Sequence, residues 1–94
     1  MPFMLVRSDV EDFDKWKSIF NQYAEVRGNY GSLGYQLFNS VDNPNETFLL
    51  FEWDSLAHAQ GFASSNDLRE AMQKAGVIGR PDVFFLKAVE EGDA

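Results

Sequence analysis

The stretch Thr47-Phe48-Leu49-Leu50-Phe51-Glu52-Trp53-Asp54 is the part of the sequence that decides the fold. Its apolar residues follow one another almost without a break, whereas a strand with one wet face alternates apolar and polar residues. We therefore expect a strand that is covered on both faces. The helices of a 94-residue chain can cover one face of a small sheet. The other face then needs a partner, most simply a second copy of the chain.

The segments around this strand predict an alternation of strands and helices. The predicted strands cover residues 3–9, 33–41, 47–53 and 83–89, and the predicted helices cover residues 13–27, 56–63 and 68–75. This is the βαββαβ order of the ferredoxin-like α+β fold. We expect an antiparallel sheet with the first and third strands at its centre, and two such sheets facing each other in a dimeric α+β barrel.

Two of the predicted helices carry a stripe of residues that would point inward. The first stripe has the 3-4-3-4 spacing of a helix face and consists of Phe13, Trp16, Phe20, Tyr23 and Arg27. Gly28 is predicted to end that helix. The second stripe consists of Leu68, Ala71, Met72 and Ala75. It is predicted to lie between a capping residue, Asp67, and a terminating glycine, Gly76.

Length and composition indicate one folded domain over residues 1–94, with a frayed acidic tail over residues 90–94. Nine Phe, three Tyr and two Trp are enough aromatic side chains for a hydrophobic core. The formal net charge of −7 argues against nucleic acid and anionic membranes as partners, since both attract basic surfaces.

The chain has no cysteine, which excludes disulfides and thiol catalysis and fits a reducing cytoplasm. The apolar stretch at residues 1–6 is too short for a signal peptide or a membrane span. With one histidine and no cysteine, we also expect no metal site. The sequence therefore predicts a cytoplasmic protein whose partners are a second copy of itself and a small molecule.

Arg7 and Glu52 are the most interesting polar pair, because both lie late in predicted strands of an apolar sheet. They would be adjacent if these two strands ran side by side in parallel. Gln36 would oppose Glu52 if the hairpin were paired so that Val41 faces Thr47. Buried polar groups must find partners, so the pair is either a structural salt bridge or the polar end of a ligand pocket.

Four aromatic residues, Trp16, Tyr23, Tyr35 and Trp53, are candidates for the lining of an aromatic-accepting cavity between the first helix and the sheet. Aromatic residues at helical or strand spacing also serve simply as core. His58 lies in the first turns of a predicted helix, where its imidazole could hydrogen-bond a ligand oxygen. The alternative is a surface helix residue beside Asp54. No motif in the sequence identifies a catalytic residue.

The segment Phe48-Leu49-Leu50-Phe51-Glu52-Trp53-Asp54-Ser55, which leads into Ala57-His58-Ala59-Gln60-Gly61-Phe62-Ala63-Ser64-Ser65, resembles the dimeric α+β barrel superfamily. The likeness is to its antibiotic-biosynthesis-monooxygenase-like group, in which a strand ending in Glu-x-aromatic precedes a helix and a Ser-containing break. Many members carry a histidine just before that break. Phe62 takes this place here, and His58 lies one helical turn earlier, so the resemblance transfers no catalytic histidine.

The resemblance implies two kinds of function. The first is a cofactor-free monooxygenase or cyclase-like enzyme that acts on a small aromatic or polyketide-like compound. Its substrate would ionise readily and activate oxygen itself, with Arg7, Tyr23, Tyr35, Glu52 or His58 as proton or anion partners. The alternative is a non-catalytic homodimer that binds a small ligand or serves in a stress response. A core with no cavity would argue against the enzyme.

Overall fold

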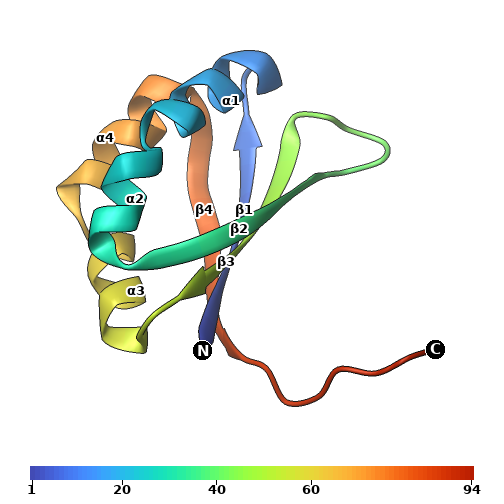
Figure 1. The fold of residues 1–94 in the computed structure, drawn as a ribbon. Coiled ribbons are helices and arrows are strands. Elements are labelled where there is room, and N and C mark those ends of the chain that lie inside the picture. The colour runs from blue at the N-terminus through green and yellow to red at the C-terminus, as the bar shows by residue number, and fades with distance from the viewer.

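The computed structural model describes all 94 residues as one four-stranded sheet and four helices. The elements are β1 (Pro2–Val10), α1 (Phe13–Gln22), α2 (Ala24–Tyr30), β2 (Ser32–Asn39), β3 (Glu46–Trp53), α3 (Leu56–Ala63), α4 (Asn66–Ala75) and β4 (Val77–Lys87). The sheet is antiparallel with the order β2-β3-β1-β4. All four helices lie on one face of it (Figure 1). The predicted ferredoxin-like α+β fold is confirmed, with the first and third strands at the centre.

The two faces of β3 have different surroundings. Thr47, Leu49, Phe51 and Trp53 are buried under the helices, whereas the residues between them point to the opposite face and remain partly exposed. That opposite face carries no helix (Figure 1), and we call it the open sheet face. A single chain therefore covers only one of the two apolar faces that the sequence of β3 predicts. None of the helices is long and apolar enough to span a membrane.

The helix predicted over residues 13–27 is wrong in its extent, because the structure has two helices there. The helix is interrupted at Tyr23, whose N–H donates to the carbonyl of Phe20 at 3.2 Å. The second helix, α2, continues past Gly28, so Gly28 does not end it as predicted. Gly31 ends α2 in the left-handed region, with φ of 111°. Its carbonyl accepts the N–H of Asp54 at 3.0 Å, so a contact with a distant segment fixes this helix end.

The ends of the last helix and strand also differ in part from the prediction. Ser65 caps α4 by accepting the N–H of Leu68 at 3.1 Å, so Asp67 lies in the first turn rather than at the cap. Gly76 ends α4 as predicted. The last strand starts earlier than expected, at Val77. Pro81 falls in the register shift of the β1–β4 ladder, where no ladder N–H is required.

Candidate functional site

A cavity lies between the helices and the sheet. Its volume is about 70 Å³, and apolar side chains form almost all of its lining. The α1 side consists of Trp16, Ile19, Phe20 and Tyr23, the α4 side consists of Leu68, Ala71, Met72 and Ala75, and the sheet contributes Met4, Val6, Leu49, Phe51 and Val77. Ser8, Arg27 and Phe62 complete the lining. Ligand pockets in proteins are mostly lined by apolar side chains with a few placed polar groups.

The sequence of the two helices explains why the space is there. The predicted stripes of α1 and α4 both face it, since residues spaced three and four apart share one side of a helix. The stripe of α1 is bulky and aromatic, with Trp16 stacked on Phe20 at 5.1 Å between ring centroids. Opposite it, Ala71 and Ala75 on α4 have only a methyl group each. The alanines leave unfilled the volume that larger side chains would occupy.

The size of the cavity limits what can enter without movement. An engineered cavity of about 150 Å³ in another protein binds benzene, and this one is about half as large. A ligand with two fused rings therefore requires the helix layer to move outward from the sheet. Met72, an unbranched and adaptable side chain on the α4 wall, and Tyr23, at the break between α1 and α2, are positioned to give way.

Arg27 is the one charged residue in the lining, and only 5 % of its surface is exposed. The guanidinium carbon lies 3.7 Å from the ring centroid of Phe20 and 5.6 Å from that of Tyr35. One nitrogen, Nη1, donates to the carbonyl of Phe20 at 2.6 Å. No carboxylate forms an ion pair with it. Burial lowers the pKa of Arg27 below its ordinary value, because a low-dielectric site disfavours the charged form.

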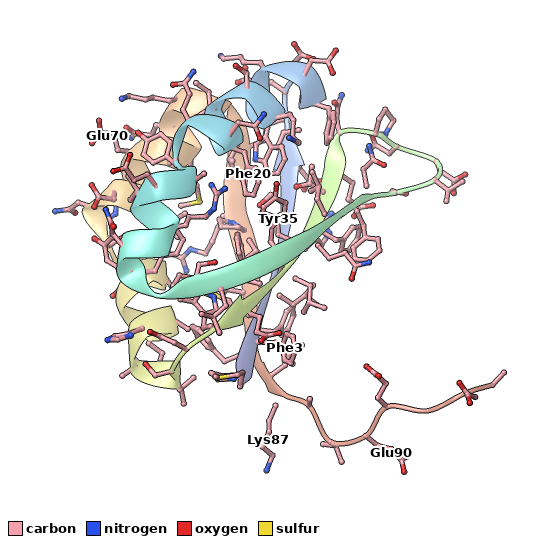
Figure 2. All side chains as sticks on the ribbon, viewed as in Figure 1. Phe3, Phe20, Tyr35, Glu70, Lys87 and Glu90 are labelled. Atoms are coloured by element: carbon pink, nitrogen blue, oxygen red, sulfur yellow. The ribbon has the colours of Figure 1, made fainter.

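The predicted aromatic site residues occupy three different environments. Trp16 and Tyr23 line the cavity. Tyr35 lies beside it, edge-on to Phe20 at 4.9 Å between ring centroids, and is about half exposed. Figure 2 shows these two residues as neighbours. Trp53 is fully buried in the core and does not line the cavity, and its indole Nε1 has no hydrogen-bond partner.

His58 lies away from the cavity, on the exposed side of α3. Its Nδ1 and Asp54 Oδ1 are 2.8 Å apart, and the His58 side chain is 60 % exposed. The backbone N–H of the same residue donates to the hydroxyl of Ser55, which caps α3. The structure therefore places this imidazole beside Asp54 on the surface.

The expected pairing of Arg7 with Glu52 is wrong. Strands β1 and β3 are antiparallel, so Glu52 lies opposite Phe3 while Arg7 lies opposite Phe48, four residues along β1. Arg7 instead binds Glu46, with Nε donating to Oε2 at 2.7 Å. Hydrogen bonding to that carboxylate is the main cause of a raised pKa for Arg7.

Arg7 also bonds to Asp9 at 3.1 Å and Asp82 at 3.5 Å, so three carboxylates surround one guanidinium on the open sheet face. The predicted hairpin register is wrong as well. Gln36 opposes Leu50, and Gly34 opposes Glu52, which is a shift of two residues. Because side chains alternate with a period of two, the shift leaves every side chain on its predicted face.

A second hollow, of about 250 Å³, lies on the open sheet face. It forms where Gly34 has no side chain opposite Glu52, and seven residues line it: Phe3, Leu33, Gly34, Tyr35, Gln36, Leu50 and Glu52. This hollow is larger than the cavity under the helices, but fewer residues line it. It also lies on the open sheet face, which is largely apolar. We therefore regard the cavity under the helices as the candidate site. No three carboxylate or imidazole groups gather to hold a metal ion.

Comparison with known structures agrees with this architecture. The chain is similar to a candidate antibiotic biosynthesis monooxygenase from Bordetella bronchiseptica, with a TM-score of 0.81 and 17% identity over 95% of this chain and 97% of that one. It is similar to SnoaB, a cofactor-independent oxygenase from Streptomyces nogalater, with a TM-score of 0.78 and 13% identity over 96% and 94% of the two chains. At these identities the likeness establishes the fold alone.

A third similar structure is a candidate antibiotic biosynthesis monooxygenase from Caulobacter crescentus, with a TM-score of 0.74 and 21% identity over 95% of this chain and 90% of that one. No curated protein sequence matches the chain. The family model for antibiotic biosynthesis monooxygenases matches residues 5–74, which include most of β1, all of β3 and most of the cavity lining. The chain therefore belongs to the antibiotic biosynthesis monooxygenase family.

Proposed function

We propose that this protein is a cofactor-independent monooxygenase that oxidises a small aromatic or polyketide-like compound in the cavity between the helices and the sheet. The observation that carries the proposal is the aromatic-walled cavity between the helices and the sheet in a chain of this family. Once the helix layer moves outward, such a cavity can hold a flat apolar ring and exclude water from it. The lack of cysteine fits an enzyme of the reducing cytoplasm.

The lining favours a substrate that ionises by itself. It contains no carboxylate and no histidine, so no side chain in it is an ordinary general base near neutral pH. A hydroxyanthrone meets this requirement, because its ring CH2 group loses a proton to give an electron-rich anion. The carbon then adds O2, the O–O bond breaks, one oxygen stays as a ketone and the other leaves as water. The CH2 group loses four electrons and O2 accepts four, so no other reductant is needed.

The test is oxygen uptake and quinone formation by 1,8-dihydroxyanthrone in buffer with a metal chelator. We expect the wild-type protein to accelerate both rates above the rate in buffer alone. Ala71→Leu, which fills the cavity, should return the rates to those of buffer. Ala57→Leu, the same change at an exposed position on α3, should behave like wild type. A wild-type rate equal to that of buffer contradicts the proposal for this class of substrate.

A non-catalytic ligand-binding role is the second candidate, and one observation favours it. The lining contains neither a carboxylate nor a histidine, so it lacks the usual catalytic acids and bases. Binding of an aromatic compound in the cavity without any acceleration of anthrone oxidation would support this role over the enzyme.

We further propose that the protein works as a homodimer in which two open sheet faces pack together. The open sheet face carries a set of large apolar side chains from all four strands: Phe3, Leu5, Phe38, Phe48, Leu50, Phe84 and Leu86. Phe38 and Phe84 are each about half exposed in the single chain. Monomeric proteins rarely expose contiguous apolar patches of this kind. A second copy would cover the patch symmetrically.

A further inference from the structure

We infer that the cavity is a binding site for an aromatic anion, and that Arg27 binds its negatively charged oxygen. This inference deepens the proposed function and rests on the same cavity. The ligand class is a flat aromatic ring that carries a carboxylate, phenolate or enolate. Ring contacts would come from the aromatic wall of α1, and charge recognition would come from the single guanidinium in the lining.

The first argument is that Arg27 is a largely buried cation without an acidic partner. Arginine is almost never fully buried unless a carboxylate or another anion accompanies it, because removing its charge from water costs several kcal/mol. Only 5 % of Arg27 is exposed, and it has no ion pair. Of its five side-chain N–H groups, its one side-chain hydrogen bond uses one, to the carbonyl of Phe20. The other nitrogens remain accessible to a water-sized molecule, so they can serve a ligand at the cavity.

The second argument is that other cations gather at the same aromatic wall. The Nζ atom of Lys17 lies 6.0 Å from the ring centroid of Phe20, and that of Lys74 lies 6.0 Å from the ring centroid of Tyr23. Both rings line the cavity. With Arg27, three of the eight basic residues in a chain of net charge −7 surround these two rings. Lys74 pairs with Glu70 at 3.1 Å and Lys17 Nζ donates to Asn21 Oδ1 at 2.7 Å, whereas Arg27 is the buried cation of the three and has no acidic partner.

A purely structural role for Arg27 would be to hold the end of α1, through its bond to Phe20 and its stacking on that ring. The two roles predict different ligand preferences. A structural arginine would let the cavity bind neutral and anionic rings of the same shape equally well. An arginine that recognises an anion would favour the charged ring, since hydrogen bonds to charged groups are about twice as strong as neutral ones.

The test compares 1-naphthoate, which is anionic at pH 7, with 1-naphthamide, a neutral molecule of nearly the same shape. Affinities are measured by isothermal titration calorimetry. We expect the wild-type protein to prefer naphthoate by about 10–100-fold. Arg27→Met should lose this preference while still binding naphthamide, which shows that the cavity is intact. Arg27→Lys should keep a reduced preference, because it keeps the charge but loses the planar fork.

Three results would overturn the inference: equal affinity of the wild type for the two compounds, binding of neither compound, or an unchanged preference in Arg27→Met. If Arg27→Met does not fold, the wild-type preference and Arg27→Lys decide the matter. The outcome is separable from the proposed enzymatic function. A preference for naphthoate without anthrone oxidation would support the anion site and contradict the monooxygenase. Anthrone oxidation without this preference would support the monooxygenase and contradict the anion site.

Discussion

Filling the cavity should stabilise the protein, and Ala71→Leu is the substitution that fills it. Ala71 lies in the middle of the α4 stripe and its methyl group lines the space. Leucine adds three carbon atoms there without changing the preference of the chain for a helix. Because the cavity separates α4 from the aromatic wall of α1, the longer side chain has room to extend toward it.

Two calculations give the same size of effect. A residual cavity costs about 24 cal/mol per Å³, so a cavity of about 70 Å³ costs about 1.7 kcal/mol. Burying three carbon atoms at about 0.8 kcal/mol each, less about 0.5–1 kcal/mol for the lost rotamer freedom of leucine, gives about 1.4–1.9 kcal/mol. We expect the free energy of unfolding to rise by about 1–2 kcal/mol.

The assay is urea denaturation at a fixed protomer concentration, because dimerisation would make the apparent stability depend on concentration. Ala57→Leu on the exposed side of α3 is the matched control and should change the free energy by no more than about 0.5 kcal/mol. A loss of 1–3 kcal/mol in Ala71→Leu, the usual result of overpacking, would refute the reasoning. It would mean that the space between α1 and α4 is already filled.

Two further predictions concern the helix end at Gly31 and the open sheet face. Gly31→Ala should cost about 1–3 kcal/mol in thermal unfolding, because φ is 111° and a Cβ would lie 2.5 Å from the Asp54 carboxylate. Gly28→Ala, in open space within α2, should instead gain up to about 1 kcal/mol, and equal effects of the two changes would contradict this account of the helix end. Leu50→Asp should convert a dimer into a monomer in analytical ultracentrifugation, since it buries a charge in the middle of the open sheet face. Val41→Asp, fully exposed in the hairpin turn, should leave the dimer intact, and a wild-type protein that is already monomeric would exclude the proposed interface.

The parts of the fold that depend on local periodicity could be predicted from the sequence. The inward stripes of α1 and α4 follow from residues spaced three and four apart, and the two faces of β3 follow from alternation. The end of α2 at Gly31 could not be predicted, because it depends on the backbone of Asp54, 23 residues away. The hairpin register could not be predicted either, because a shift of two residues leaves the same side chains on each face of the sheet.

The sequence predicts part of the aromatic lining of the candidate site, but it does not predict the charged residue in that lining. Trp16 and Tyr23 were expected at a cavity, and they line it. Arg27 was recognised only as the last member of a helical stripe. A basic residue at a position that continues an apolar stripe was the available signal, but long side chains in such places usually extend into solvent. The strand positions of Arg7 and Glu52 predict a pair only if β1 and β3 are parallel. The two strands are antiparallel, and this places the two residues apart.

The central claim is that the cavity between the helices and the sheet binds an aromatic anion, and methionine methyl NMR tests it most directly. The chain has three methionines. Met4 and Met72 line the cavity, whereas Met1 is 72 % exposed at the start of the chain and provides an internal control. With methyl-13C-methionine labelling, saturating 1-naphthoate should shift the Met4 and Met72 resonances and leave that of Met1 in place. Unchanged Met4 and Met72 resonances under the same conditions would contradict the claim.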